Sequence, residues 1–368
     1  MEPVFIHQLA TAVPQYAVSQ AFARETLKAQ LTGDRLAQRL IYRLYTQSGI
    51  DTRYSVVPDF AEPSKDATPH VGLFLGEGGR YTSPSTKVRN DLYTKAARPL
   101  FKEAAEKVLA GSGFGAGDVT HVVTVSCTGF CAPGPDYFLV RDLCLSPDVG
   151  RFHVGFMGCY AAFPALKMAK AFCQADPSAV VLVVCLELCT LHLQLGGDFD
   201  RLLASSVFAD GAGAALVSAR EPQGAAFELS ALATTLTPVG EDDMAWSVGD
   251  EGFDIVLSSY VPEILEANIG AALAPLFAQF DLSVSEIDRW GVHPGGRAIL
   301  DKVEKGLGLA EDALAPSRRV LRDYGNMSSA TVLFVLKEIL EDSKKGERVC
   351  AVAFGPGLTV ESGLLTRC

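Results

Sequence analysis

The sequence is short of charged residues and has no long apolar run. Charged residues make up 20% of its 368 residues and hydrophobic residues 48%, a balance that excludes disordered, collagen-like and low-complexity proteins. No apolar run approaches the roughly 18 residues that a transmembrane helix needs. Lys and Arg number 32 against 43 Asp and Glu, giving a net charge of -11, which disfavours nonspecific binding to nucleic acid or anionic lipid. These absences leave a soluble, packed enzyme as the default expectation.

The sequence also lacks the features of a secreted disulfide protein. Its nine cysteines are scattered along the chain, and no signal peptide precedes them, which is typical of a reduced cytoplasmic protein. The pairs Cys127/Cys131 and Cys185/Cys189 each have three intervening residues, a spacing that leaves a zinc site as an alternative. The second pair ends the apolar run AVVLVVCLELC, where free cysteine behaves as a small hydrophobic residue. We therefore expect no metal and a cytoplasmic location.

The length and the apolar pattern favour an α/β protein built from two packed parts. A chain of 368 residues exceeds what one core usually supports. Apolar, β-branched runs alternate with amphipathic segments, and several runs are apolar on both faces, as central strands of a covered sheet are. The predicted strands are residues 119–126, 151–156, 179–187, 212–219, 289–293 and 349–354. The other predictions are helices at 160–175 and after Asn326, a surface loop at 58–85, and weak signals at 221–244.

Cys159 lies where a predicted strand gives way to a helix, in the segment GFMGCYAAFPALKMAKAF. Gly158 permits a tight turn there, and Pro164 is tolerated near the first turn of a helix. A thiol at a helix N-terminus has a lowered pKa, because unpaired N–H groups and the helix dipole favour the thiolate. Cys159 is therefore a candidate nucleophile, although a cysteine at such a junction is more often a packing residue.

Two later segments offer the partners that a nucleophilic cysteine needs. His293 ends a predicted strand in WGVHPGGRAIL, where a Pro-Gly-Gly turn would hold the imidazole over a cleft. Asn326 begins a predicted helix in DYGNMSSATVLF. Taken singly, Asn326 is typical of a helix N-cap and His293 of a loop histidine. Together with Cys159 they form a possible Cys-His-Asn site.

These three residues and their flanking sequences resemble the type III polyketide synthases, the family of chalcone and stilbene synthases in the thiolase superfamily. In AFGPGLTVESGLL (353–365), Ala353 replaces the first glycine of the family's Gly-Phe-Gly-Pro-Gly loop, and VFADGAGAALV (207–217) and APGPDYFLV (132–140) also match. The resemblance covers about residues 5 to 365. It implies a homodimer with a thiolase-like α/β fold, in which two pseudo-twofold-related halves are layered α-β-α-β-α. The halves are expected at residues 1–220, which carry the nucleophile, and 221–368, which carry His293 and Asn326.

The resemblance also implies an acyltransferase that takes coenzyme A thioesters as substrates and needs no metal or other cofactor. Cys159 would carry the acyl group, and an ion pair with His293 would hold its thiolate. His293 and Asn326 would donate hydrogen bonds to the thioester carbonyl of malonyl-CoA as carbon dioxide leaves. The resulting carbanion would attack the acyl-enzyme, and repeated extension would build a polyketide that then cyclises.

Other positions are carried over from the family to the wall of the substrate cavity. Phe208 matches a gatekeeper phenylalanine between the CoA tunnel and the cavity, with a core aromatic as the alternative. Ile255 falls where plant members carry a second gatekeeper phenylalanine, and Trp246 falls near a glycine that sets cavity volume. The remaining predicted substrate-binding residues are Cys127, Thr128, His192, Ser328, Phe354, Gly355 and Pro356.

Coenzyme A carries phosphates, so an acidic chain needs local cations to hold it. Arg39 and Arg43 lie one helical turn apart in RLIYRLYTQSGI. Arg43 matches a basic position of the family, Arg39 does so approximately, and Gln47 replaces a lysine; a solvated arginine face is the alternative. The other predicted CoA-binding residues are Gly295, Gly296 and Ala298.

The departures from plant enzymes resemble bacterial members of the family. Aliphatic Ile255 would widen the cavity entrance, which favours an acyl-CoA starter with a fatty chain, extended with malonyl-CoA to an alkylpyrone or alkylresorcinol. One alternative is an aromatic- or malonyl-primed enzyme of the same family. Another is a single-condensation β-ketoacyl-(acyl carrier protein) synthase, which typically shows His-Gln-Ala-Asn where this chain has HPGGRAIL. A third is a scaffold that has lost its chemistry.

Overall fold

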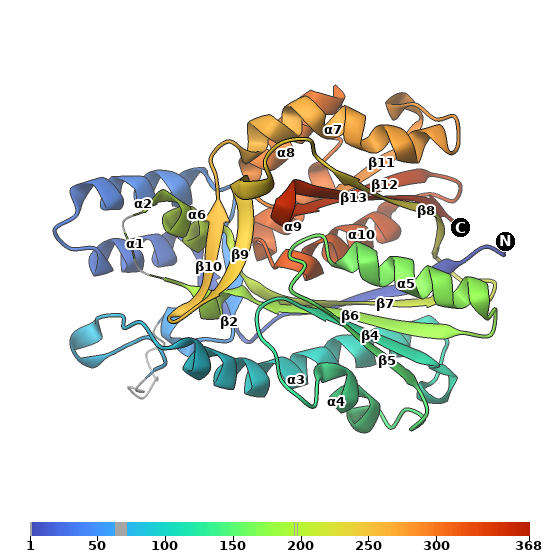
Figure 1. Cartoon of the computed structure of the whole chain (residues 1–368), viewed down its shortest axis with the longest axis horizontal. Helices are drawn as coiled ribbons and strands as arrows, with labels where there is room; N and C mark the ends of the chain where they lie inside the picture. Colours follow the sequence, from blue (N-terminus) through green and yellow to red (C-terminus); the bar gives the residue numbers. More distant parts are fainter. Residues whose placement is uncertain (1, 63–71, 195, 197) are drawn as a thin grey trace.

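The computed structural model describes residues 2–62, 72–194, 196 and 198–368. In this part of the chain, nine strands form one sheet in the order β11-β12-β13-β8-β1-β7-β6-β4-β5, and the pairs β10-β9 and β2-β3 stand apart from it (Figure 1). The strands are β1 (Phe5–Ala12), β2 (Tyr16–Ser19), β3 (Thr52–Ser55), β4 (His121–Ser126), β5 (Gly150–Gly155), β6 (Val180–Leu188), β7 (Asp210–Ser218), β8 (Phe227–Leu236), β9 (Met244–Gly249), β10 (Gly252–Leu257), β11 (Arg289–Val292), β12 (Arg348–Gly355) and β13 (Thr359–Arg367).

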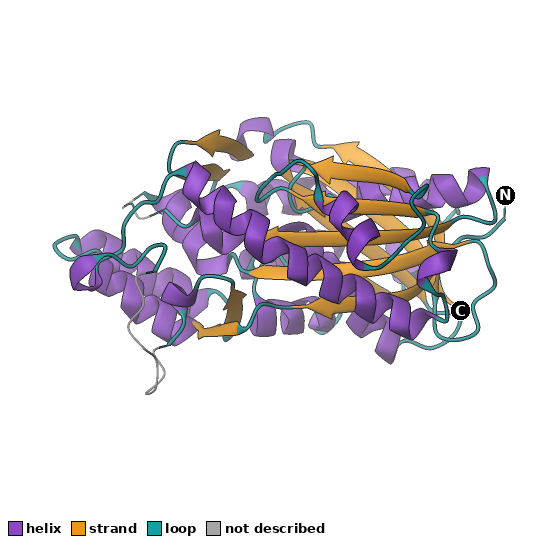
Figure 2. Cartoon of the chain, turned by 90° about the horizontal axis from the view of Figure 1, so that it is seen from below, coloured by secondary structure: helices purple, strands orange, loops and turns teal. Residues whose placement is uncertain are grey.

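Helices cover both sides of the strands (Figure 2). The helices are α1 (Gln20–Gln30), α2 (Arg35–Gln47), α3 (Thr86–Ser112), α4 (Pro135–Asp142), α5 (Ala162–Ala175), α6 (Phe199–Val207), α7 (Val261–Ala278), α8 (Arg297–Leu307), α9 (Ala315–Tyr324) and α10 (Thr331–Asp342). Short 3-10 turns that matter below are η4 (Cys189–His192), η7 (Ser328–Ala330) and η8 (Pro356–Leu358).

Three apolar cores reveal a five-layer arrangement. One core lies between α3 and α4 and the strands of the N-terminal half, and another lies between α7 and α8 and the strands of the C-terminal half. The third surrounds α5 and α10 in the centre and contains residues of both sets of strands. Residues Phe5 and Ile6 of β1 pair with Glu228 and Phe227 of β8 to join the two sets. The predicted α-β-α-β-α layering is confirmed.

The two halves repeat one strand topology, although residue identities show no repeat. In the N-terminal half, β1 is antiparallel to β7, β7 is antiparallel to β6, and β6 is parallel to β4. In the C-terminal half, β8 is antiparallel to β13, β13 is antiparallel to β12, and β12 is parallel to β11. This shared connectivity is the internal repeat expected of a thiolase-like fold.

The six predicted strands are β4, β5, β6, β7, β11 and β12, each within two residues of its predicted limits. The helix predicted at 160–175 is α5, and the one predicted after Asn326 is α10, which begins at Thr331. The weak region 221–244 contains β8, whose first half alternates buried and half-buried residues. Of the predicted loop 58–85, residues 63–71 lie outside the described residues.

Among the described helices, α7 is long and apolar enough to span a membrane by length and composition. It packs against α8 and against strands β8 and β13. Leu265, Ile269 and Leu273 are buried in those contacts. The apolar character of α7 is therefore explained by its place in the C-terminal core.

Candidate active site

Three chain segments bring Cys159, His293 and Asn326 to one cavity. Cys159 lies in the turn between β5 and α5, His293 follows β11 directly, and Asn326 precedes η7 and α10. All three line a cavity of about 620 Å³. The residues singled out in the sequence therefore converge, one from the N-terminal half and two from the C-terminal half.

The turn that carries Cys159 is packed against the glycine loop at the end of β12. Gly158 has a positive φ of 79°, and a Cβ there would lie 2.4 Å from Cδ of Pro356. A Cβ on Gly355 would lie 2.6 Å from Cδ1 of Tyr160 and 3.4 Å from the backbone N of Cys159. Only glycine fits this approach, so the loop fixes the position of the candidate nucleophile.

Strained backbone surrounds the same cavity. Phe156, Ser328 and Leu358 are non-glycine residues with φ of 58°, 45° and 46°. Phe156 precedes the Cys159 turn, Ser328 opens η7, and Leu358 closes η8. Such conformations cost about 1–3 kcal/mol each and cluster at functional sites, because the surrounding packing must hold them.

Burial keeps both Cys159 and His293 neutral. Desolvation raises the pKa of the Cys159 thiol to about 11, although the side chains of Ser328 and Asn326 oppose the shift. Desolvation lowers the pKa of His293 to about 3, and among the described residues neither ring nitrogen has a hydrogen-bond partner. The lowered thiol pKa expected from the sequence is therefore wrong for this structure, and the Cys159–His293 ion pair stays a prediction. The reason is that Cys159 precedes the first turn of α5 and lies where isolated charges are disfavoured.

Asn326 connects the turn that follows His293 to the turn that begins at Ser328. Its Nδ2 donates to the carbonyl of Gly295 at 3.2 Å, and its Oδ1 accepts from the backbone N–H of Ser328 at 2.9 Å. It is not the N-cap of α10, which is Ala330. Because an amide nitrogen has two N–H groups, one donor of Asn326 is left for a group in the cavity.

Glu187 is a buried carboxylate beneath the cavity that the sequence analysis missed. Its oxygens accept from the backbone N–H of Cys127 at 2.9 Å, from Oγ1 of Thr128 at 2.8 Å and from Oγ of Ser329 at 2.5 Å. Desolvation raises its pKa despite these bonds. A signal was present in the sequence, since an acidic residue inside a continuous apolar strand is seldom buried without a partner. Glu187 ties the wall segment 127–128 to η7.

Phe208, Trp246 and Ile255, together with Cys189, form a partition between the catalytic cavity and a second cavity of about 830 Å³, because all four line both. Trp246 on β9 pairs directly with Ile255 on β10. The indole Nε1–H of Trp246 donates to the carbonyl of Cys127 at 2.9 Å. The backbone next to Phe208 pairs with Asn326, since Ala209 N–H donates to the carbonyl of Asn326 at 2.8 Å. The predicted gatekeeper positions thus lie beside the catalytic residues.

His192, a predicted substrate-binding residue, is not among the residues that line the catalytic cavity. It lines the second cavity, and both ring nitrogens are bonded to backbone. Phe253 N–H donates to Nδ1 at 3.0 Å, so the proton is on Nε2, which donates to the carbonyl of Thr128 at 2.7 Å. Desolvation lowers the pKa of His192 to about 3. The imidazole is neutral and has no polar atom left for a substrate.

The other predicted positions divide into those at the cavity and those on the surface. Gly295 lines the cavity, Gly296 caps the N-terminus of α8, and Ala298 is exposed. Arg39 and Arg43 are both exposed; Arg43 donates to Gln47 at 3.3 Å, and Arg39 lines a separate surface hollow on α1 and α2. The remaining predicted residues that line the catalytic cavity are Cys127, Thr128, Ser328, Phe354 and Pro356.

A thiol, a neutral imidazole and an oriented amide meet in one cavity of a five-layer α/β fold, which defines a condensing enzyme of the thiolase-like class. Family models for the N- and C-terminal domains of chalcone and stilbene synthases match residues 3–222 and 228–368. The chain therefore belongs to the chalcone and stilbene synthase family. It is a type III polyketide synthase, an acyltransferase of a family that uses coenzyme A thioesters.

Individual relatives agree with this assignment. The chain is 32% identical to the alpha-pyrone synthesis polyketide synthase-like Pks18 of Mycobacterium tuberculosis over 368 residues, covering 98% of this chain and 90% of the relative. It superposes on PKS-I of the brown alga Ectocarpus siliculosus with a TM-score of 0.92 at 30% identity, covering 100% and 99% of the two chains. It also superposes on the bacterial 1,3,6,8-tetrahydroxynaphthalene synthase of Streptomyces coelicolor A3(2) with a TM-score of 0.84 at 28% identity, covering 98% and 99%.

Proposed function

We propose that this polyketide synthase loads a fatty acyl group from coenzyme A onto Cys159, extends it with malonyl-CoA and releases an alkylpyrone or alkylresorcinol. The observation that carries the proposal is the second cavity of about 830 Å³ behind Phe208, Trp246 and Ile255. Apolar and aromatic side chains form most of its lining, among them Val18, Ala23, Leu27, Phe60 and Leu193. A long alkyl chain gains about 0.8 kcal/mol for each methylene that it buries. A relative named for alpha-pyrone synthesis supports the same product class.

Loading of the starter uses Cys159 and His293 together. The sulfur attacks the thioester carbonyl while its proton passes to His293, so that the neutral pair of the resting site becomes an ion pair only as the bond forms. The tetrahedral intermediate collapses by breaking the carbonyl carbon–sulfur bond to coenzyme A. The departing thiolate takes the proton from His293, which leaves an acyl-Cys159 thioester and a neutral imidazole.

Extension uses His293 and Asn326 as donors. Their N–H groups bond the thioester carbonyl of malonyl-CoA, so that the electron pair left by the breaking carboxylate bond is held as an enolate when carbon dioxide departs. The enolate carbon attacks the carbonyl of acyl-Cys159, forms the new carbon–carbon bond and expels the Cys159 thiolate. The chain, two carbons longer and attached to coenzyme A, returns to Cys159 for the next cycle.

The other predicted residues are assigned to binding. We place the growing chain against the walls formed by Cys127, Thr128, Ser328 and Phe354, with Gly355 and Pro356 behind the nucleophile. Bound coenzyme A would extend from the cavity to the surface past Gly295, Gly296 and Ala298. Its phosphates would reach the exposed arginines Arg39 and Arg43. For these surface cations a solvated role is the competing explanation.

A homodimer formed at β5 is part of the proposal. This strand lies at the edge of the nine-stranded sheet in the described part of the chain, and its residues Phe152 and His153 are exposed. Phe130 and Phe156 are 54% and 40% exposed near the same edge. An edge strand with apolar side chains can pair with another strand, and a second copy of the chain supplies one.

We also propose a cytoplasmic location, which the nine free cysteines fit.

The test is a starter panel with malonyl-CoA. Purified enzyme is incubated with acyl-CoAs from acetyl to palmitoyl and with p-coumaroyl-CoA, and the products are identified by mass spectrometry. Long-chain triketide or tetraketide pyrones and resorcinols are the expected products. Products made only from p-coumaroyl-CoA or from malonyl-CoA alone would overturn the fatty starter and favour the aromatic- or malonyl-primed alternative.

A further inference from the structure

The hairpin β9–β10 carries two of the four partition residues but is not part of the main sheet. Its strands pair only with each other in the described structure, and they lie between the main sheet and α6 (Figure 1). Trp246 and Ile255 sit opposite one another on it. An isolated two-stranded hairpin is marginally stable in water. Its position over the cavities must therefore be set by contacts from other elements.

The first turn of α3 clasps the tip of the hairpin. Thr86 N–H donates to the carbonyl of Asp250 at 2.8 Å, and Gly252 N–H donates to Oγ1 of Thr86 at 2.8 Å. The same hydroxyl donates to the carbonyl of Gly249. One threonine thus satisfies backbone groups on both sides of the turn and holds the tip of the hairpin, while at the base Leu257 N–H donates to Oδ2 of Asp200 at 3.4 Å.

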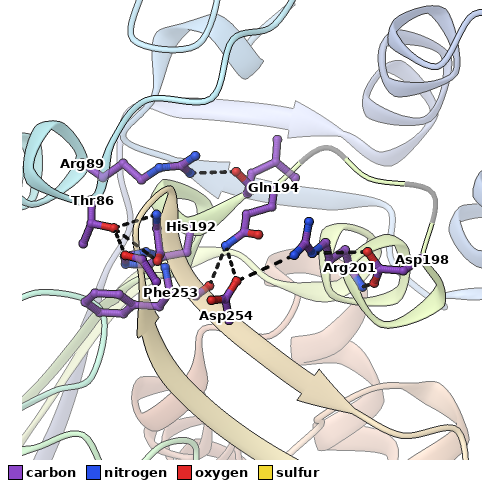
Figure 3. Close-up of polar contacts among 11 residues, drawn as sticks. Thr86, Arg89, His192, Gln194, Asp198, Arg201, Phe253 and Asp254 are labelled. Carbon is purple, nitrogen blue, oxygen red and sulfur yellow. Dashed lines mark hydrogen bonds and ion pairs between the residues drawn. The ribbon is translucent and has the colours of Figure 1, made fainter.

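The loop after β6 holds the first residues of β10, next to the tip of the hairpin, through side chains (Figure 3). His192 Nδ1 accepts from the backbone N–H of Phe253 at 3.0 Å, and Gln194 Nε2 donates to the carbonyl of Phe253 at 3.2 Å. Gln194 also donates to Oδ1 of Asp254 at 3.0 Å. The His192 ring stacks on the Phe253 ring with centroids 4.0 Å apart and planes 13° apart. Both polar backbone groups of Phe253 are therefore bonded to side chains of this loop.

Arg89 makes the loop itself rigid. Its guanidinium donates to the carbonyls of Leu191 and Leu193, each at 2.7 Å, and to that of Pro84 at 2.8 Å. Arg89 is fully buried, and a buried cation with several carbonyl partners is costly to displace. Because Arg89 lies one turn after Thr86 on α3, the same helix end anchors both the tip of the hairpin and the loop that holds the first residues of β10.

His192 also ties the hairpin to the floor of the catalytic cavity. Its Nε2 bonds the carbonyl of Thr128 at 2.7 Å, while Trp246 Nε1 bonds the neighbouring carbonyl of Cys127 at 2.9 Å. These two bonds set the separation between the hairpin and the segment beneath it. A change in either shifts Trp246 and Ile255 relative to the thiol.

We propose that His192 and Gln194 are positioning residues that set the width of the partition between the two cavities and thereby the length of starter that the enzyme accepts. They act on the substrate through Trp246 and Ile255, without touching it with a polar atom. The proposal rests on the proposed extension of acyl-CoA starters. It goes beyond a cavity-lining role for His192, because the hydrogen-bonding geometry of the ring, and not its bulk, is what matters.

A matched pair of substitutions separates geometry from bulk. In His192→Asn the side-chain oxygen takes the place of Nδ1 and keeps an acceptor for Phe253, whereas in His192→Gln the amide nitrogen takes the place of Nε2 and keeps only the bond to Thr128. Gln194→Leu removes the bonds to Phe253 and Asp254 without touching His192. Asp254→Asn keeps an oxygen for Gln194 and serves as the control.

The measurement is kcat/KM for a short and a long acyl-CoA starter, with malonyl-CoA decarboxylation measured in parallel. We expect His192→Gln and Gln194→Leu to change the ratio of long to short starters by about tenfold or more, the size of effect that reshaping an apolar pocket produces. His192→Asn and Asp254→Asn should stay within about threefold of wild type, and decarboxylation within about twofold in all four variants.

Tryptophan fluorescence gives an independent readout of the hairpin. The chain has two tryptophans; Trp290 is buried in the C-terminal core, at 3% exposure, and Trp246 is on the hairpin. Acrylamide quenching should rise in His192→Gln and Gln194→Leu and remain at the wild-type level in His192→Asn. Folded His192→Gln and Gln194→Leu variants with wild-type quenching and an unchanged starter ratio would overturn the inference. If the wild type extends no fatty starter, the proposed function fails. The ratio of kcat/KM between two starters that the enzyme does accept, compared between wild type and variants, still decides whether His192 and Gln194 are positioning residues.

Discussion

The catalytic turns and the β9–β10 hairpin face the same cavity but are held in different ways. Backbone holds the turns: Gly158 and Gly355 allow contacts that no side chain permits, and Asn326 is bonded to backbone at both ends of its amide. Side chains hold the hairpin, chiefly His192 and Gln194. The close approach at Gly158 and Gly355 is lost when either glycine is replaced, because no side chain fits there. A contact made by a side chain can instead be replaced by a contact from another side chain. The chemistry of this enzyme is therefore built into its fold, and the shape of its substrate space depends on a few exchangeable residues.

The strongest test of this comparison removes the nucleophile. Cys159→Ala should reduce product formation by about 10³-fold or more, because no acyl-enzyme can form. Decarboxylation of malonyl-CoA should persist, since His293 and Asn326 are untouched. The measurement is product by mass spectrometry beside carbon dioxide release. The control is Cys131→Ser, at a half-buried cysteine outside the cavity lining, which should retain activity. Product formation by Cys159→Ala would refute the mechanism.

The next effect concerns the oriented amide. Asn326→Asp keeps the acceptor for Ser328 N–H and loses the donor toward the cavity, so decarboxylation should fall by about 10²-fold, as for other lost oxyanion donors. Unfolding temperature should fall, because the bond to the carbonyl of Gly295 is lost, although the bond from Ser328 N–H remains. A variant that decarboxylates malonyl-CoA at the wild-type rate would show that Asn326 serves only to connect the two turns.

The backbone contact itself can be tested with one methyl group. Gly158→Ala places a Cβ 2.4 Å from Cδ of Pro356 at a φ of 79°, and we expect it to destabilise the protein by about 2–4 kcal/mol and to impair acyl loading. Gly224→Ala is the control, because nothing lies within 4 Å of its added Cβ. Urea unfolding measures the difference. Equal stability of the two variants would mean that the glycine loop does not constrain the Cys159 turn.

The smallest expected effect is on the pH dependence of stability. Burial lowers the pKa of His192 and His293 to about 3, so below pH 6.5 the unfolded chain binds protons that the folded chain does not. Stability is then lost as pH falls from about 6.5 toward 3, by about 1.4 kcal/mol per pH unit for each histidine. Asp210 works in the opposite direction over part of this range, because burial raises its pKa to about 6 and the folded chain takes up its proton first.

His192→Gln removes one of these titrating groups. The stability difference between wild type and this variant should therefore shrink by about 1 kcal/mol between pH 6.5 and pH 5.5. Urea unfolding across that range provides the measurement. Parallel curves for the two proteins would mean that His192 titrates normally and that the hydrogen bonds assigned to its neutral ring are not formed in solution.

Local sequence predicted the elements whose signal is local. Strands such as β6 and β7 are continuous apolar runs, and a glycine turn followed by an amphipathic helix marks the Cys159 segment. Strands β8, β9 and β10 were not predicted, because their half-exposed faces give weak patterns and their places depend on distant partners. The convergence of Cys159, His293 and Asn326 followed from the family resemblance, since no local pattern relates residues in different halves.

The protonation states of the site residues, and the hydrogen bonds made by residues around the site, could not be predicted from the sequence. The neutral forms of Cys159 and His293 result from burial by residues far apart in the chain. The hydrogen bonds of His192 could not be predicted either, because its partners Thr128 and Phe253 lie 64 and 61 positions away. Glu187 depends in the same way on Cys127 and Ser329.

The division of the site between the two halves affects how the protein is made. Cys159 belongs to the first half of the chain, whereas His293, Asn326 and the loop around Gly355 are synthesised much later. Domains fold as they emerge during synthesis, so the first half can form its strands while its thiol still lacks the imidazole, the amide and the covering loop. Strand β13, which completes the second half by pairing with β8 and β12, follows that loop directly. The thiol of the first half therefore lacks its complete surroundings until the strands and loop of the second half have been synthesised.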